Sequence, residues 1–359
     1  MKTNYFELPN ETKPDNETLE MLQNTVIPVV MPIMYSILAF ISIPGNSISL
    51  WILIFHSRPI TASIIFMINL SITDLVLAVF LPFQIIYHIN KSHWPFGKGL
   101  CNVMSLLFYV NMYSSILTIM LISIDRYIGI VHPMQSSMWR RKRYAVTACI
   151  IMWTFLLLSF YPLASTDLTY KVDSLNITTC FDVLKWKMLP NLATWAAFII
   201  GLVFVLFFIP SVVVVVCYTL IIRKLFQTSN RYGSSKRSIK LAFTVLLVFL
   251  TCFAPNNIVL LVHAINRIFY GISYYYAYKL TLTLSCLSSC LDPFLYYFAS
   301  KDFYKKFTEV FGKKTKQSET CETRRGSLFS GKSMTFSSGH GEGLQNGSCQ
   351  LIQRQESDV

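Results

Sequence analysis

The chain has 359 residues, of which 53% are hydrophobic and 14% are charged, and its formal net charge is +13. Soluble domains carry about 25% charged residues, so this composition argues against a soluble protein and predicts one membrane domain with two tails. Nucleic-acid binding is disfavoured although the chain is basic, because Lys and Arg gather in connections between apolar segments and in the C-terminal tail.

Seven apolar segments are long enough to cross a membrane as helices, since a span needs about 20 apolar residues. In chain order they cover 27–55, 64–89, 100–131, 144–164, 191–222, 239–265 and 276–299. We therefore predict an all-α membrane protein with a seven-transmembrane helix bundle over 27–299. A transporter or channel is disfavoured because no internal repeat is present. No nucleophile–base pair or metal-ligand spacing predicts an enzyme.

The distribution of charge predicts the orientation in the membrane. Basic residues cluster in Arg140–Arg143, between Arg223 and Lys240, and after Lys301, whereas the N-terminal tail is acidic. By the positive-inside rule, the basic connections and the C-terminus lie in the cytoplasm, and residues 1–26 lie outside the cell. We expect a multi-pass protein of the plasma membrane.

The region after the seventh span changes character twice. In residues 300–312 phenylalanines recur every four positions with lysines between them, which predicts an amphipathic helix on the inner leaflet and contact with membrane lipids. Residues 313–359 are rich in Ser, Thr, Gly and Gln and are expected to be disordered. This tail offers a kinase site at Ser327 and a PDZ-domain ligand ending in Ser357 and Val359.

Two of the nine cysteines, Cys101 and Cys180, fall on the outer side in this topology. An oxidising exterior favours a disulfide between them, which would staple the loop after the fourth span across the mouth of the bundle. Two free thiols are the alternative. N-glycosylation sequons place acceptor asparagines on the same side at Asn10, Asn16 and Asn176.

Short motifs occur in order along the spans. They are Gly45–Asn46, Asn69–Asp74, Asp125–Tyr127, Trp153, Pro210 with Tyr218, Phe249–Pro255, and Asp292–Tyr296. With this order and spacing, residues 25–312 resemble the rhodopsin-like G-protein-coupled receptors. Phe253, where most members have Trp, and Asp292, where most have Asn, resemble the purinoceptor-like branch. That branch includes nucleotide, lysophospholipid and protease-activated receptors.

The resemblance implies that one end of the bundle couples to a heterotrimeric G protein and recruits arrestin. Asp125 would hold the guanidinium of Arg126, next to Tyr127, until activation frees it to contact the G protein. Tyr218 and Tyr296 match the tyrosines that swing in to support this arginine. A structural ion pair that only closes the helix end is the alternative.

Two further groups of residues follow from the same resemblance. Asp74, Asn46, Ser115 and Asp292 match a mid-membrane polar cluster that often holds a sodium ion, and hard oxygens suit such a cation. A purely structural polar network is the alternative, and no other cofactor is predicted. Phe249, Phe253 and Pro255 match the residues that switch the sixth helix, with plain core packing as the alternative reading of Phe253.

Aromatic and basic residues gather toward the outer halves of the helices and predict a ligand pocket. They are Tyr109, Tyr113, Lys185, Asn257, His263, Arg267, Tyr275 and Lys279. Cations beside aromatic rings suit an anionic ligand with an apolar part, although each cation could instead reach lipid headgroups. Nucleotide receptors often carry His and then a basic residue where Asn257 and Leu260 stand here, and a basic residue where Leu282 stands. We therefore favour a lipid-type or lipid-conjugate anion, with a nucleotide second, and the Rho-activating class of G protein.

Overall fold

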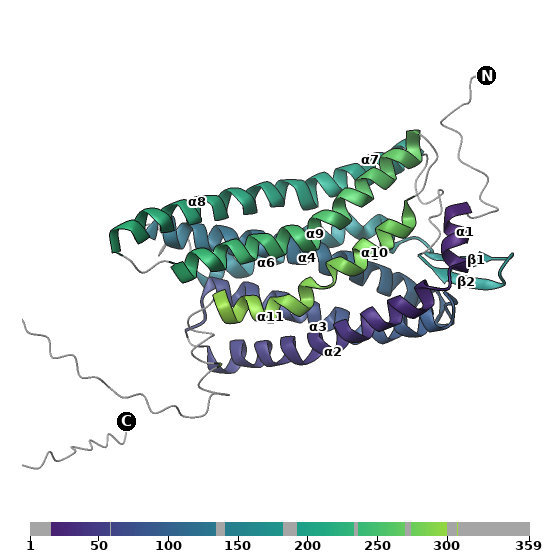
Figure 1. Cartoon of the computed structure of the whole chain (residues 1–359), viewed down its shortest axis with the longest axis horizontal. Coiled ribbons are helices and arrows are strands. Elements are labelled where there is room, and N and C mark those ends of the chain that lie inside the picture. The colour runs from purple at the N-terminus through teal and green to yellow at the C-terminus, as the bar shows by residue number, and fades with distance from the viewer. Residues whose placement is uncertain are drawn as a thin grey trace, which may run out of the picture. The chain divides into compact units, whose positions relative to one another are not determined.

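A computed structural model of the chain describes residues 16–57, 59–133, 141–181, 192–232, 236–269, 274–299 and 307. Long helices run along a common direction, and a short helix and a hairpin lie at one end (Figure 1). The long helices are α2 (Ile27–Trp51), α3 (Ala62–Ile89), α4 (Gly97–Val131), α6 (Lys142–Ala164), α8 (Ile209–Tyr232) and α9 (Lys236–Phe269). The shorter helices are α1 (Asn16–Gln23), α7 (Leu192–Val203), α10 (Tyr275–Ser285) and α11 (Ser288–Ala299).

Six predicted spans are confirmed as helices that are long and apolar enough to cross a membrane, among the residues that the structure describes. The seventh predicted span, 276–299, is instead divided into α10 and α11, with a turn at Cys286 and Leu287. Backbone N–H groups at this turn bond three residues back rather than four. The hydroxyls of Ser285, Ser288 and Ser289 also compete for nearby carbonyls. The serine-rich sequence therefore interrupts the helix.

Two helices contain wider π turns. The helix α2 continues through η1 (Ile52–His56), and α7 continues into α8 through η3 (Phe204–Phe208). The second of these lies just before Pro210, which has no backbone N–H and cannot complete the α-helical ladder. The proline signal in the sequence thus marks a local change of helical geometry.

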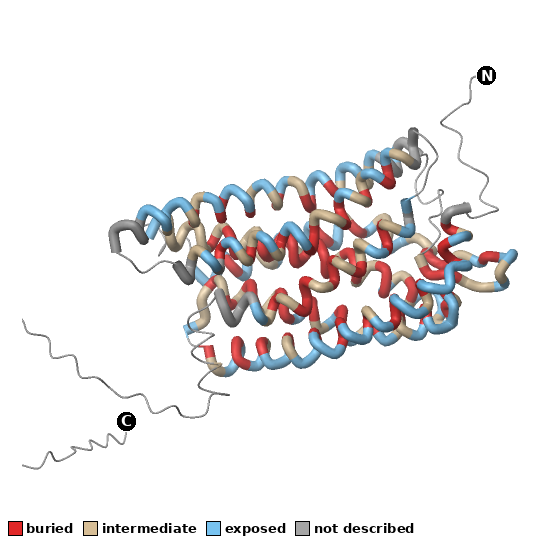
Figure 2. Tube along the Cα trace, in the orientation of Figure 1, coloured by how far each residue is buried: buried red, intermediate tan, exposed pale blue. Residues whose placement is uncertain are grey.

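Burial follows the bundle axis (Figure 2). Buried residues line the inside of the helices, and large apolar side chains remain on the outside, for example Phe40 at 81% and Leu158 at 70% exposure. Exposed apolar surface on this scale is unusual for a soluble protein and is what a lipid-facing surface requires.

One end of the bundle, here called the hairpin end, carries two elements that the sequence reading did not predict. After α6, the strands β1 (Thr169–Val172) and β2 (Ile177–Cys180) pair antiparallel, with Thr169 opposite Cys180. The helix α1 lies within the predicted N-terminal tail and contacts α10, with Met21 and Leu22 buried. The N-terminal tail therefore contributes packing to this end.

Candidate functional site

The end of α4 opposite the hairpin end carries Asp125, Arg126 and Tyr127. The Asp125 carboxylate accepts a hydrogen bond from the Ser63 hydroxyl of α3. Arg126 makes no ion pair with Asp125 in the described part of the chain, and its charge acts on the buried Tyr218 of α8. The structure thus brings Arg126 and Tyr218 together and assigns Asp125 a partner on another helix.

The structure describes the whole of Tyr127 but only the backbone of Tyr296, the two other residues of this predicted switch. The Tyr127 hydroxyl lies 3.1 Å from Nε2 of His132, just beyond the end of α4. The backbone of Tyr296 belongs to α11, and its side chain lies outside the described residues. Its predicted approach to Arg126 therefore stays a prediction.

The four residues of the predicted mid-membrane polar cluster, Asn46, Asp74, Ser115 and Asp292, are all fully buried. The carboxyl groups of Asp74 and Asp292 are neighbours. One oxygen of Asp74 accepts a hydrogen bond from Asn111 Nδ2 at 3.0 Å. The remaining carboxyl oxygens, together with the Ser115 hydroxyl and Asn46 Oδ1, have no hydrogen-bond partner among the described residues.

This arrangement needs a positive charge. Two buried carboxylates next to each other cannot both be ionised without a proton or a cation between them. The unpaired oxygens are hard ligands of the kind that a sodium ion accepts. The residues therefore fit a small cation, and Asn111, which donates to Asp74, belongs to the same cluster.

The side chain of Asn46 also joins α2 to α11. Its Nδ2 donates to the Ser289 carbonyl at 2.8 Å, and this carbonyl lies four residues before Pro293. Because Pro293 has no N–H, the Ser289 carbonyl has no helical partner, and the asparagine supplies one. Gly45 permits the approach, since a Cβ there would lie 3.1 Å from the Pro293 ring.

The predicted switch residues of α9 are packed in the core. Phe249 and Phe253 are buried, with ring centroids 5.5 Å apart and planes at 59°. Asn257 Nδ2 donates to the Phe253 carbonyl at 2.9 Å, and Asn257 Oδ1 accepts from the Tyr113 hydroxyl at 3.0 Å. Asn256 Nδ2 also donates to Met112 Sδ of α4 at 3.1 Å, so the helix turn around Pro255 is tied to α4 through two asparagines.

The predicted pocket residues that the structure describes are buried toward the hairpin end. Tyr109 accepts a hydrogen bond from the Tyr278 hydroxyl at 2.6 Å. His263 Nδ1 accepts from the backbone N–H of Tyr274 at 3.0 Å. The Lys279 ammonium lies 5.4 Å from the centroid of the Tyr87 ring, and only 8% of the residue is exposed.

These contacts divide the predicted pocket residues into a pair that holds two helices together, a buried cation, and residues whose side chains are not described. Tyr113 and Asn257 bond to each other, so both are committed to holding α4 against α9. Lys279 is a buried cation against an aromatic face. Lys185 and the side chains of Arg267 and Tyr275 lie outside the described residues, so their place in the pocket stays a prediction.

The hairpin end is closed by the predicted disulfide, which is confirmed between Cys101, in the first turns of α4, and Cys180 at the end of β2. The backbone N–H of Trp94 donates to the Thr178 carbonyl at 2.7 Å, and that of Cys180 donates to the Tyr87 hydroxyl at 3.4 Å. The hairpin is thereby fixed to α3 and α4.

The modification and tail predictions are only partly covered by the structure. Asn176 is exposed in the hairpin turn, which is accessible to a glycan, whereas Asn16 begins α1 with its side chain undescribed. The other predictions lie outside the described residues, apart from Phe307, which packs against the core. They concern Asn10, Ser327, Ser357, Val359, the interfacial helix 300–312 and the tail 313–359.

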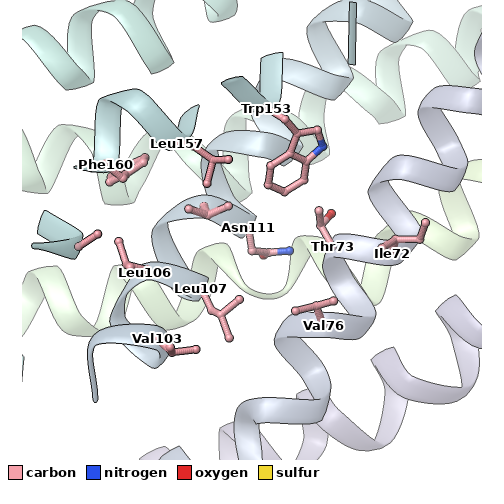
Figure 3. A pocket seen from close by; sticks show the side chains of 12 residues that line it. Ile72, Thr73, Val76, Val103, Leu106, Leu107, Asn111, Trp153, Leu157 and Phe160 are labelled. Carbon is pink, nitrogen blue, oxygen red and sulfur yellow. The ribbon is translucent and has the colours of Figure 1, made fainter. Parts of the chain in front are cut away.

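A groove of about 380 Å³ lies between α3, α4 and α6. Figure 3 shows its apolar side chains, with Asn111 and Thr73 as polar groups among them. The groove shares no residue with the predicted pocket. Its lining residues Ile72, Val76 and Leu157 are exposed on the outside of the bundle, where lipid chains would surround them.

Two residues with clear chemistry were missed by the sequence reading. Ser63 bonds to Asp125 across 62 positions of sequence, and His88 is fully buried near Lys279. No local motif signals either contact, because both depend on how separate helices are rotated against each other.

Comparisons with known proteins agree with this architecture. A family model described as 7 transmembrane receptor (rhodopsin family) matches residues 45–296. The chain is 61% identical to a Y-type purinoceptor, number 8, of Gallus gallus, over 96% of this chain and 97% of that protein. It is 53% identical to the S-geranylgeranyl-glutathione receptor of Homo sapiens, over 98% and 99%. It is 36% identical to Proteinase-activated receptor 2 of Homo sapiens, over 80% and 73%.

Proposed function

Because this chain belongs to the rhodopsin family of seven-transmembrane receptors, we propose that an extracellular anion with a long apolar part activates it. Membership makes it a G-protein-coupled receptor of the plasma membrane, with a heterotrimeric G protein as partner, and not an enzyme. The proposal concerns the class of ligand and the class of G protein.

The observation that carries the ligand proposal is Lys279. It places a positive charge against the Tyr87 ring among the predicted pocket residues, and a positive charge there attracts an anionic ligand. The tyrosines around it favour an apolar body next to that anion. The relative from Homo sapiens is named a receptor for S-geranylgeranyl-glutathione, which combines a polyisoprenyl chain with carboxylates. A prenyl conjugate of an anionic peptide is thus our first choice.

The test is nucleotide exchange in membranes that contain this receptor and one purified G protein from each of the four classes. We expect S-geranylgeranyl-glutathione to stimulate exchange, most strongly on the Rho-activating class, which the resemblance to lysophospholipid-type receptors favours. Adenosine and uridine di- and triphosphates are expected to be inactive. A response to a nucleotide without a response to the conjugate would overturn the ligand proposal.

The same proposal fixes the remaining partners and the orientation. The hairpin end faces the cell exterior, because the basic connections lie at the opposite end of the spans and favour the cytoplasm. Arrestin and a PDZ protein bind the cytoplasmic tail. Membrane lipids surround the exposed apolar face and fill the groove between α3, α4 and α6, whose lining is almost entirely apolar.

We further propose that the cluster of Asp74 and Asp292 holds a sodium ion in the inactive receptor. Replacing sodium chloride by choline chloride is then expected to raise agonist affinity, by a factor within the usual allosteric range of about 5 to 150. Asp74→Asn should remove this dependence, because the amide supplies no charge for the ion. Agonist binding in matched salts measures both effects.

Ser211→Ala is the matched control for that experiment, since Ser211 also has a buried hydroxyl with no partner among the described residues but lies on α8. It should keep the full response to sodium. An Asp74→Asn receptor with undiminished sodium dependence would contradict the assignment of the ion to this cluster.

A further inference from the structure

The groove between α3, α4 and α6 is built from regular faces of its helices. Its lining residues on α6 recur every three or four positions, at Trp153, Leu157, Phe160 and Ala164. Those on α4 follow the same spacing from Val103 to Asn111. Residues spaced in this way lie on one face of a helix. The two faces therefore form the walls of an elongated groove (Figure 3).

The groove extends over about half of the membrane. From Trp153 to Ala164 the helix α6 rises about 16 Å, at about 1.5 Å per residue, whereas the hydrocarbon core of a bilayer is about 30 Å thick. Ala164 is the last residue of α6, and Val103 lies two positions after Cys101 of the disulfide. This end of the groove therefore belongs to the hairpin end, and the groove runs from there toward the middle of the bilayer.

The volume of the groove selects the size of its occupant. A cavity of about 150 Å³ lined by apolar side chains binds benzene. At the same density, the groove's volume of about 380 Å³ holds roughly fifteen carbon atoms. A single acyl chain of a phospholipid has a comparable number of carbons and an elongated shape. A sterol has nearly twice as many carbons and exceeds the volume of the groove.

The polar side chains along the groove already donate to partners in the protein. The Thr73 hydroxyl donates to the Leu70 carbonyl at 2.8 Å. Asn111 Nδ2 donates to Asp74 Oδ1 at 3.0 Å. The rest of the lining is apolar apart from the indole nitrogen of Trp153. The groove therefore offers mainly hydrocarbon contacts, which favours a hydrocarbon occupant.

The groove opens onto the outer surface of the bundle. Its lining residues Val76, Val103 and Leu157 are exposed there, and so is Leu158, which follows Leu157 on α6 but does not line the groove. This surface faces lipid in a membrane-spanning bundle. A lipid chain can therefore enter the groove sideways from the bilayer, without passing through the protein.

One wall of the groove also reaches the carboxylate cluster. Asn111 lines the groove and donates to Asp74, whereas Asp74 does not line it. An occupant packed against Asn111 leaves its side chain no room to turn away from Asp74 into the groove. Occupancy thus favours the arrangement in which Asn111 donates to Asp74, since a ligand shifts a population toward the state that it binds better.

We propose that the groove binds one acyl chain of a phospholipid from the outer leaflet, and that this chain strengthens sodium binding at Asp74 and Asp292 through Asn111. This inference rests on the proposed orientation and on the proposed ion site. The coupling is reciprocal, so bound sodium also strengthens binding of the chain.

The first experiment locates the chain by photolabelling. The full-length receptor is placed in nanodiscs that contain phosphatidylcholine with a diazirine in the middle of one acyl chain, and labelled residues are identified by mass spectrometry. We expect labels to concentrate on the groove residues. Leu157→Trp fills the groove and should reduce this labelling by at least about fivefold, the factor expected from overpacking a site. Leu158→Trp is the matched control and should keep the labelling.

The second experiment measures the coupling without any agonist. The melting temperature of the receptor is followed as sodium chloride replaces choline chloride, in phosphatidylcholine with straight chains or with methyl-branched phytanoyl chains, which are too wide for the groove. Half of the rise in melting temperature should need at least about fivefold less sodium in the straight-chain lipid. Leu157→Trp should remove this difference between the lipids, and Leu158→Trp should retain it.

The outcomes separate this inference from the proposed function. Labels spread evenly over the exposed apolar surface, or unchanged by Leu157→Trp, would overturn the chain site. Labelling of the groove that excess S-geranylgeranyl-glutathione suppresses would overturn it too, because the prenyl chain of that conjugate would then be the occupant. If sodium changes the melting temperature in neither lipid, the proposed ion site fails and the coupling fails with it, whereas the labelling still decides the chain site.

Discussion

Arg126→Ala is expected to abolish agonist-stimulated nucleotide exchange on the G protein, down to the level of membranes without receptor. The guanidinium of Arg126 makes no ion pair with Asp125 in the described residues, and its charge acts on the buried Tyr218. It is therefore available to an incoming partner at the end of the bundle opposite the hairpin. Exchange in reconstituted membranes and receptor density at the cell surface are the two measurements.

Surface density should stay close to that of the unmodified receptor, because Arg126 is only half-buried and holds no other helix through a described hydrogen bond. Arg141→Ala, which removes an exposed arginine at the start of α6, is the matched control and should signal normally. Arg126→Lys keeps the charge but not the planar fork of donors, and we expect only weak signalling from it. Full signalling by Arg126→Ala would refute the role given to this residue.

The spans themselves could be predicted from the sequence because their signal is local. Each predicted span is a run of apolar residues whose length alone meets the membrane requirement, and six of them are confirmed as helices within a few residues. The disulfide could also be predicted from the sequence, since the predicted topology places only Cys101 and Cys180 on the outer side, and it is confirmed.

The features that the sequence did not predict depend on competition between hydrogen bonds or on contacts between residues far apart in the sequence. The break between α10 and α11 arises because serine hydroxyls compete for backbone carbonyls, while hydropathy stays high through it. The hydrogen bond from Ser63 to Asp125 requires a particular rotation of α3 against α4. The same holds for the approach of His88 to Lys279, from distant parts of the chain.

The junction of α2 and α11 explains why several motif residues occur together. Pro293 frees the Ser289 carbonyl, Asn46 donates to that carbonyl, and Gly45 lets the two helices approach. Asn46 Oδ1 is buried and stays unpaired among the described residues, as do oxygens of Asp74 and Asp292. Asn46 thus connects the carbonyl that Pro293 leaves unpaired in the seventh span to the proposed ion site. A structural change at one of these places can therefore be transmitted to the other.

Removing the disulfide is expected to be the most destabilising change at the hairpin end. Cys101 and Cys180 are separated by 79 positions in the sequence. Closing a loop of this length stabilises a fold by up to about 4.5 kcal/mol in the chain-entropy account. Cys101→Ser, Cys180→Ser and the double variant should therefore each lower the apparent melting temperature of the purified receptor by several degrees. They should lower it equally, because all three remove the same bond.

The free thiol Cys149 on α6 provides the control, and Cys149→Ser should leave the melting temperature nearly unchanged. Loss of the disulfide should also weaken ligand binding. The Cys180 backbone N–H donates to the Tyr87 hydroxyl, and the Lys279 ammonium lies over the Tyr87 ring. We therefore expect the disulfide variants to bind S-geranylgeranyl-glutathione more weakly even at temperatures where they remain folded. Weakened stability with undiminished binding would show that the hairpin anchors the fold without positioning Tyr87 and Lys279.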